Sequence, residues 1–432
     1  MEVLKARKEE RDLVAATQVC VRWHEILASA PSLWARIDVK YPGHLPCLYL
    51  KRSKGTLIDV TLGKPSNILN PADKFVASTL WIARTKTLCI QGGPGQIREI
   101  AEGLCQEAPS LRSLTIEGNG ASACVHFPDN FLGKYAPSLQ SLTLCSVSPQ
   151  KVFTLPLPKL THIDWVAGHV VIEELLELFE SSPLLESIRM AVLIQTDRKK
   201  PLKKVTLSNL CELEWADSGG STSLMSYLIA PKLNKLDIRI THNPQHRPTT
   251  LSSTLPSDGN HIPLLLEPVA VAYVHEYGTR TYYFDYPETA CLVISESNIN
   301  PTISRWFSPD FPISFSRVRK LGVQAIASLP PLDEVPIERF ESLHELQLIG
   351  KVDSLAQMMG GNNDRLIPCP ALSKIWISPI NGSSSLGKLK KVLEKRREAG
   401  HRVKTVQISR VNKCMDAEIE GLRTLVDEVI TE

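Results

Sequence analysis

The sequence predicts an α/β solenoid, a fold in which short strands stack into one curved parallel sheet and helices cover its convex side. One apolar phrase, Leu-x-x-Leu-x-Leu, recurs along the chain. Its copies follow one another at intervals of 21 to 31 residues on either side of one gap. Several copies come directly after Ala-Pro-Ser or a similar triplet, at 108–110, 136–138, 230–232 and 369–371. Because proline ends a helix, these triplets predict that each strand follows a helical stretch.

The clearest copy of the phrase has its apolar positions at Leu111, Leu114 and Ile116, and Glu117-Gly118-Asn119 follows it. This is the pattern of a leucine-rich repeat, whose period is about 20 to 29 residues. Eleven further copies begin at residues 57, 85, 139, 160, 185, 210, 233, 318, 343, 372 and 403. Isolated apolar triplets arise by chance, but twelve at such regular spacing do not. We therefore predict an irregular leucine-rich repeat array over residues 41–410.

Within each copy, the second and third apolar positions alternate along a strand and should face the core. The expected core side chains are Leu114, Ile116, Leu142, Leu144, Leu213, Leu236, Ile238, Leu346, Leu348, Ile375 and Ile377. The residues between them should line the concave face, and they are mostly polar. This face is acidic at Glu212 and Glu214 and becomes more basic toward the C-terminal end, where Trp376 adds an aromatic side chain.

Aromatic and cationic side chains are common anchors of protein interfaces. We therefore expect a target protein to bind the C-terminal half of the concave face, through Arg239, Lys320, Gln347, Lys374 and Trp376. The alternative is that Trp376 packs under a neighbouring loop and binds nothing.

The remaining elements complete the expected array. Residues 170–179 predict a convex-side helix. The stretch around 241–260 is rich in proline, serine and threonine and predicts an inserted loop, and strand-like runs at 269–274, 281–286 and 290–295 predict one or two degenerate repeats. Near the end, Ile419, Leu422, Val426, Val429 and Ile430 lie on one helical face. Residues 411–432 therefore predict a C-terminal capping helix, which such arrays need.

The N-terminal segment predicts a helix with an unusually wide apolar stripe. Asp12 is a suitable N-cap and Pro31 a stop. The stripe consists of Leu13, Ala16, Cys20, Trp23 and Leu27, widened by Val19 and Ile26. A stripe this wide on a short helix indicates contact on two sides, with the chain's own core and with a partner. The alternative is a buried N-terminal cap helix.

The residue order in this segment resembles the C-terminal two-thirds of an F-box. The match rests on Leu-x-x-Ala-x-x-Val-Cys-x-Arg-Trp from Leu13 to Trp23 and on Pro-Ser-Leu-Trp at 31–34. Residues 47–62 resemble the segment that follows the F-box in a large group of fungal F-box proteins with irregular leucine-rich repeats. The Leu-Pro-x-Glu helix that usually opens an F-box has no counterpart here, so we expect a partial F-box-like segment over residues 1–40.

The resemblance implies that the chain is a substrate receptor of a Skp–cullin–F-box ubiquitin ligase and performs no chemistry itself. The F-box segment would bind the Skp adaptor, weakly or not at all if its first helix is truncated, and the repeats would hold the target. The implied adaptor contacts are Leu13, Val14, Val19, Cys20, Trp23, Ile26 and Leu27. Trp34 is expected in the core. A second possibility is a leucine-rich repeat scaffold that no longer binds the adaptor.

Composition and motifs argue against other classes. The net charge of +3 shows no basic field for nucleic acid, and the charged N-terminus is unlike a signal peptide. The ten cysteines are scattered without a CxxC pair, which predicts a reducing cytoplasmic or nuclear location and no metal site. We expect no cofactor and no membrane partner.

One loop keeps an enzyme as a remote alternative. Residues Gly382 to Lys388 approximate a nucleotide-binding P-loop, but Leu389 stands where Ser or Thr would hold magnesium. A nucleotide-dependent enzyme that uses this loop is therefore the third functional hypothesis, after the ligase receptor and the scaffold. The basic run from Lys388 to Lys404 is expected to be the solvated face of a helix, with Leu389, Val392 and Leu393 buried.

Overall fold

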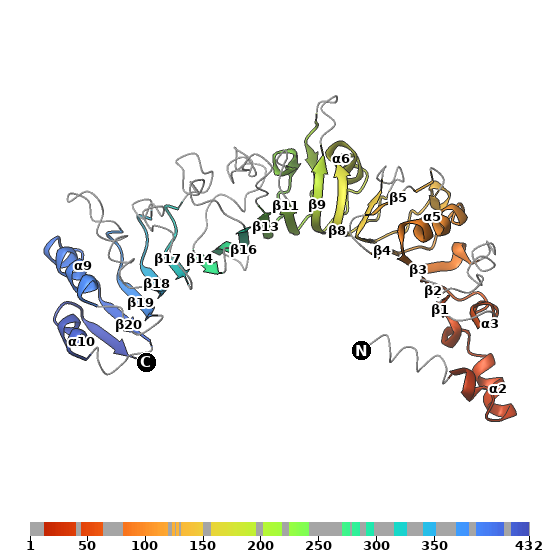
Figure 1. Ribbon diagram of the computed structural model, residues 1–432, viewed down its shortest axis with the longest axis horizontal. Coiled ribbons are helices and arrows are strands. Elements are labelled where there is room, and N and C mark those ends of the chain that lie inside the picture. Colours follow the sequence, from red (N-terminus) through yellow and green to blue (C-terminus); the bar gives the residue numbers. More distant parts are fainter. Residues whose placement is uncertain are drawn as a thin grey trace. The chain divides into compact units, whose positions relative to one another are not determined.

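The computed structural model describes residues 13–39, 45–63, 81–119, 123–125, 127–128, 131–149, 157–195, 202–217, 224–241, 270–276, 279–285, 291–297, 315–325, 340–350, 369–379, 386–409 and 416–431. In the strands between 270 and 297 it describes the backbone alone. The chain divides into two compact units, Met1–Leu185 and Glu186–Glu432, which we call unit 1 and unit 2. Each is built on a large, mainly parallel sheet with helices (Figure 1). The predicted α/β class and parallel strands are confirmed.

Unit 1 contains one main sheet whose described strands all run parallel. In pairing order they are β1 (Arg36–Asp38), β2 (Ile58–Leu62), β3 (Thr85–Gly92), β4 (Ser113–Gly118), β6 (Ser141–Cys145) and β8 (His162–Val171). A second small sheet pairs β5 (Ala123–Val125) with β7 (Val147–Pro149). The helical elements are α2 (Val21–Ala28), η1 (Pro31–Trp34), α3 (Leu45–Arg52), η2 (Ile82–Arg84), α5 (Pro94–Gly103), η3 (Phe131–Lys134) and α6 (Ile172–Glu180).

The core of unit 1 consists of rows of apolar side chains that run across the strands. The parallel register aligns Leu88, Leu114, Leu142 and Ile163 in one row, and Ile90, Ile116, Leu144 and Trp165 in the next. All eight side chains are buried. The sheet already begins at β1, before the predicted array start at residue 41, because Trp34 and Ile37 join this core.

The helix expected at 170–179 is shifted toward the C-terminus. Val170 and Val171 still belong to β8, and α6 begins at Ile172. Glu173 and Glu174 lie in its first turn, where carboxylates stabilise the helix dipole. β-branched valines fit a strand better than a helix, which explains the later start.

Unit 2 contains eleven described strands of the main sheet. In pairing order its described strands are β9 (Ser187–Gln195), β11 (Glu212–Asp217), β13 (Lys235–Thr241), β16 (Cys291–Ser297), β15 (Thr279–Asp285), β14 (Ala270–Glu276), β17 (Lys320–Ala325), β18 (Glu345–Gly350), β19 (Lys374–Pro379), β20 (Thr405–Ile408) and β21 (Glu428–Thr431). β10 (Val205–Thr206) pairs separately with β12 (Leu228–Ile229). The helical elements are η4 (Leu224–Tyr227), α9 (Gly387–Glu398) and α10 (Asp416–Arg423). All eleven predicted core side chains of the two units are buried.

Residues 270–297 enter the sheet of unit 2 as a meander in reversed order. β16 pairs with β13, β15 pairs antiparallel with both β16 and β14, and β14 pairs with β17. The expectation of degenerate repeats here is therefore wrong, although strands lie at all three predicted runs. Only two residues, 277 and 278, connect β14 to β15, and a parallel crossover needs a dozen or more. The predicted loop at 242–260 lies outside the described residues.

The C-terminal segment is a helix followed by a strand, so the prediction of one capping helix over 411–432 is wrong. In the described part of this segment, residues 416–431, only α10 is helical, with Ile419 and Leu422 buried. Val429 and Ile430 lie on β21, which pairs parallel with β20. Val429, Ile430 and Thr431 are three consecutive β-branched residues, which favour a strand over a helix.

Candidate protein-interaction surfaces

The predicted N-terminal helix is interrupted, which changes the surface it presents. Residues 13–16 are helical, a turn follows, and α2 begins at Val21. Cys20 has an extended backbone, with φ −161° and ψ 167°. The single stripe expected along a continuous helix is therefore wrong. The usual sequence signal for a helix start is missing here. Cys20, the N-cap residue of α2, is not a common capping residue, and its side chain makes no capping hydrogen bond.

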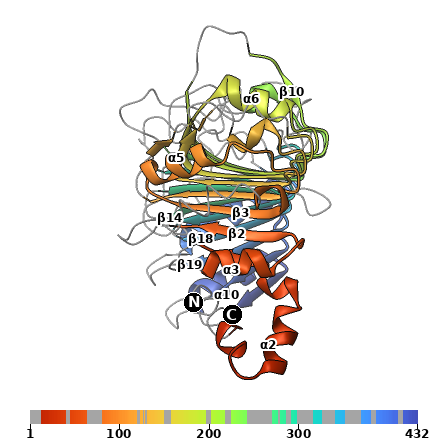
Figure 2. The ribbon, with the colours of Figure 1, turned by 90° about the vertical axis from the view of Figure 1, so that its right-hand side faces the viewer.

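The interruption is accompanied by several large apolar side chains that are exposed to solvent. α2, whose eight residues are all described, has no buried residue. We call these exposed side chains on and next to α2 the α2 surface; their exposed fractions are 67% for Val19, 75% for Val21, 52% for Trp23, 55% for Ile26 and 47% for Leu33. Figures 1 and 2 both place α2 beyond α3, at the β1 end of unit 1. Large exposed apolar clusters commonly mark interaction sites.

Of the seven predicted adaptor contacts, Val19, Trp23 and Ile26 belong to the α2 surface. Cys20 is also exposed, whereas Leu13, Val14 and Leu27 are half-buried. Sequence reasoning missed Val21 and Leu33, because neither lies on the stripe of a continuous helix.

Trp34 ties this segment to the sheet. Its side chain is fully buried, as predicted, and its indole Nε1 donates a 2.7 Å hydrogen bond to the carbonyl of Leu27, near the end of α2. The Tyr49 ring packs edge-on against it at 4.9 Å, and the Arg52 guanidinium lies 4.3 Å from the ring centroid. Both partners come from α3. Trp34 is thus the contact through which α3 holds α2 in place.

Arg84 holds the end of α3. Its guanidinium donates hydrogen bonds to the carbonyl of Leu50 at 2.8 Å, to the carbonyl of Lys54, and to Ser53 Oγ at 3.1 Å. Carbonyls in the last turn of a helix lack intrahelical donors, so this side chain acts as a C-terminal cap from a distant part of the chain. Desolvation lowers the pKa of Arg84 below its ordinary value, and the side chain remains cationic.

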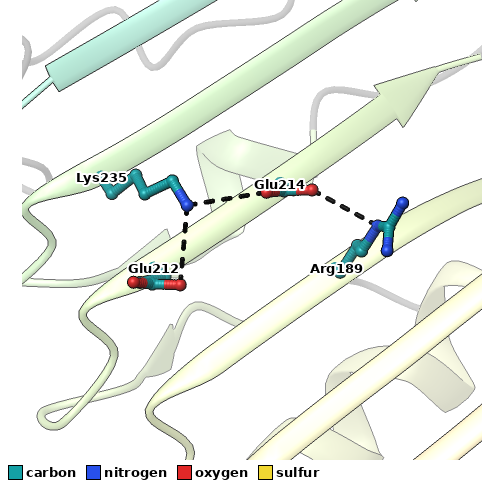
Figure 3. A network of polar contacts seen from close by, with 4 residues as sticks. All are labelled: Arg189, Glu212, Glu214 and Lys235. Atoms are coloured by element: carbon teal, nitrogen blue, oxygen red, sulfur yellow. Dashed lines mark ion pairs between the residues drawn. The ribbon is translucent and has the colours of Figure 1, made fainter.

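One face of the unit 2 sheet carries the polar residues that alternate with the buried ones, and we call it the polar face. On this face, a charge network joins β9, β11 and β13 (Figure 3). Glu214 lies between Arg189, at 3.4 Å, and Lys235, at 3.7 Å, and Lys235 also reaches Glu212 at 3.8 Å. The parallel register places Glu212 beside Lys235 and Glu214 beside Arg189. The acidic centre predicted from the sequence is thus neutralised by cations from the neighbouring strands.

The predicted target-binding residues lie on β17 to β19, apart from Arg239 on β13, whose side chain lies outside the described residues. Lys320 forms an ion pair with Glu345 at 3.4 Å. The register then places Glu345 beside Lys374, and Gln347 beside Trp376. Trp376 is half-buried, and its Nε1 donates to Ser409 Oγ at 3.1 Å.

The P-loop-like segment lies partly outside the described residues, at 382–385. At its end, Leu389 is buried and Lys388 is exposed on α9. The backbone N–H of Leu386 donates to the Glu418 carboxylate at 3.1 Å. Helix N-termini attract anions, and here a carboxylate of the chain already occupies that place. This contact favours a structural role for the segment.

The basic run from Lys388 to Lys404 is predicted from the sequence to be solvated throughout. This is wrong for Arg396, which is buried. Arg396 is 2% exposed, and its Nη2 donates to the carbonyl of Cys369 at 2.8 Å. Desolvation lowers the pKa of Arg396, and the nearby Cys369 raises it. Helical periodicity contained the signal, because Leu389, Val392 and Arg396 follow one another at the spacing of a buried face.

No family model matches the chain, and a search among curated proteins finds no match. None of the helices in the described ranges has the length and apolar character needed to span a bilayer. The side chains described also include no group of three or more His, Cys, Asp or Glu that could hold a metal ion.

Proposed function

We propose that this chain is a protein-interaction module, an F-box-like substrate receptor of a Skp–cullin–F-box ubiquitin ligase. In this proposal a leucine-rich repeat solenoid binds the target, and the N-terminal segment binds the Skp adaptor. The solenoid reading is supported by the coincidence of the repeated phrase with successive parallel strands, including β4, β6 and β8. The receptor performs no chemistry itself.

The α2 surface is the observation that carries the proposal. An isolated exposed apolar residue is ordinary on a soluble protein, but here Trp23, Ile26 and three other large apolar side chains are exposed within one short segment. Leaving them in water is unfavourable, and a full burial of each against a partner would contribute about 1.5–3 kcal/mol. The Trp34 contact holds this surface in place without burying it. A partner that covers α2 is the simplest explanation of these exposed side chains.

The test is direct binding of purified Skp adaptor to the chain, measured by biolayer interferometry. The double variant Trp23→Ser with Ile26→Ser should weaken binding by at least tenfold, because both side chains are exposed and should matter only in the complex. The matched control is Leu184→Ser, an apolar side chain of unit 1 that is 44% exposed and lies elsewhere. It should leave the affinity unchanged.

Two results would contradict the proposal. Adaptor binding that survives the Trp23 and Ile26 substitutions would place the contact elsewhere. No adaptor binding at high micromolar concentration would instead favour the second candidate, a leucine-rich repeat scaffold without adaptor binding. The interruption of the helix at residues 17–20 is the observation that favours this second candidate, because it divides the apolar stripe of the F-box-like segment.

A further inference from the structure

The polar face of unit 2 carries two clusters of charge, and they differ in what they offer a ligand. In the network on β9, β11 and β13, two cations and two carboxylates satisfy one another. A charged ligand would have to break these pairs, so the gain from binding would be offset by their loss. This part of the face is therefore a poor anchor for a charged partner.

In the second cluster, on β17, β18 and β19, the charges are not all paired with one another. Glu345 is committed to Lys320 at 3.4 Å, and Lys374 on the next strand makes no ion pair within the described residues. Lys374 is half-buried, and a lysine of this kind packs its aliphatic stem while its ammonium group stays toward solvent. Trp376 lies two residues further along the same strand and on the same face.

Trp376 offers an apolar surface, not a hydrogen bond. Its only donor, Nε1, is already bonded to Ser409 Oγ, and this bond fixes the ring on the sheet. Beside it on β18, the Gln347 amide makes no hydrogen bond to a described residue and is half-exposed. One ammonium, one aromatic face and one amide therefore lie within a small area, which we call the Lys374 site.

We propose, resting on the function proposed above, that the Lys374 site binds an extended segment of the target protein with an acidic residue two positions from a large apolar residue. Strands rise about 3.3 Å per residue, so Lys374 and Trp376 are about 6.6 Å apart along β19. An extended ligand that runs along β19 has the same repeat. Its carboxylate would meet the Lys374 ammonium, its apolar side chain would cover the Trp376 ring, and Gln347 would bond its backbone.

The test is selection of a phage-displayed random 12-residue peptide library on the purified full chain. The expected result is an enriched pattern of Asp or Glu, any residue, then a large apolar residue, in either direction. Synthetic fluorescein-labelled peptides of this pattern should bind at least tenfold more weakly to Lys374→Glu and to Trp376→Ala. Trp376→Phe should retain binding, since it keeps an aromatic face.

Lys235→Glu is the matched control, because Lys235 is a half-exposed cation on the same face but within the neutralised network. It should leave peptide affinity within twofold of the original. Selection on Lys374→Glu should yield Lys or Arg in place of the acidic residue, a reversal that loss of structure cannot produce. Equal melting temperatures of Lys374→Glu and the original chain would show that the variant folds.

Enrichment that lacks an acidic residue, or peptide binding that Lys374→Glu does not change, would overturn the inference. The inference would also be overturned if selection on the original chain enriched the same peptides as selection on the double variant Lys374→Glu with Trp376→Ala. Adaptor binding measured on the same preparation separates the two proposals. A chain that binds adaptor but no such peptide refutes only the Lys374 site, whereas one that binds the peptides but no adaptor refutes the ligase function.

Discussion

Replacing Trp34 should destabilise unit 1 and release α2 from the sheet. The Trp34 side chain is fully buried between α2 and α3. Truncation of a buried tryptophan to alanine costs about 3–5 kcal/mol, from lost burial and from the cavity left behind. Trp34→Ala also removes the donor to the Leu27 carbonyl and the ring beneath Arg52, a cation–π contact worth about 0.5–2 kcal/mol.

Trp34→Phe separates the hydrogen bond from the packing. Phenylalanine keeps an aromatic ring against Tyr49 and Arg52 but cannot donate to Leu27. Its cost should therefore be smaller, about 1–2 kcal/mol, from one neutral hydrogen bond and a modest loss of volume. For a unit of this size, 1 kcal/mol corresponds to about 2–4 °C in melting temperature. We expect a decrease of about 10 °C for Trp34→Ala and a few degrees for Trp34→Phe.

Differential scanning calorimetry measures the two melting temperatures, and hydrogen exchange followed by mass spectrometry reports on α2 itself. Amides of Val21–Ala28 should exchange faster in both variants, and much faster in Trp34→Ala. Equal effects of the two substitutions would show that the hydrogen bond, not the packing, holds α2. Unchanged exchange of α2 in Trp34→Ala would refute the assignment of Trp34 as its anchor.

Two further substitutions and one titration test other parts of the structure. Arg84→Met should lower the melting temperature by several degrees, because it removes the donors from the end of α3; a change below 1 °C would contradict the capping role. Gly168→Ala should destabilise unit 1, because a Cβ there would lie 2.5 Å from Trp165 Nε1 and 2.6 Å from the Val147 carbonyl oxygen. Gly95→Ala, where a Cβ meets nothing within 4 Å, is its control and should not lower the melting temperature, because alanine favours the helix that Gly95 lies in. Isothermal titration with magnesium and ATP should give no heat of binding, since the Glu418 carboxylate lies at the start of α9; saturable binding would revive the enzyme alternative.

Most strands of the repeated phrase, and the side of each that is buried, can be predicted from the residues alone. Leu114 and Ile116, or Ile375 and Ile377, alternate with polar residues along their strands. When one face of a sheet is covered, such an alternation places all of the apolar side chains on the buried face. The interval between copies is also visible in the sequence, and it predicts parallel strands because each copy needs a crossover to reach the next. These features are local or periodic, so no knowledge of distant contacts was required.

Other features depend on tertiary contacts and cannot be predicted from local patterns. The break before α2 has no capping signal at Cys20, and it leaves Val21 and Leu33 in solvent, where a continuous helix gave no reason to expect them. The reversed order of β14 to β16 depends on pairing partners far along the chain, β13 and β17. Propensity identifies such strands but does not say which neighbour each one takes.

The same holds for the charges on the polar face. Arg189 pairs with Glu214, and Lys320 with Glu345, across strands whose residues are 25 positions apart in the chain. The register of neighbouring strands brings such side chains within reach of each other. The sequence shows that Lys320 and Lys374 lie on one face, and the register places Glu345 beside both of them. Only the side-chain contacts show that Glu345 pairs with Lys320, at 3.4 Å, whereas Lys374 makes no ion pair among the described residues.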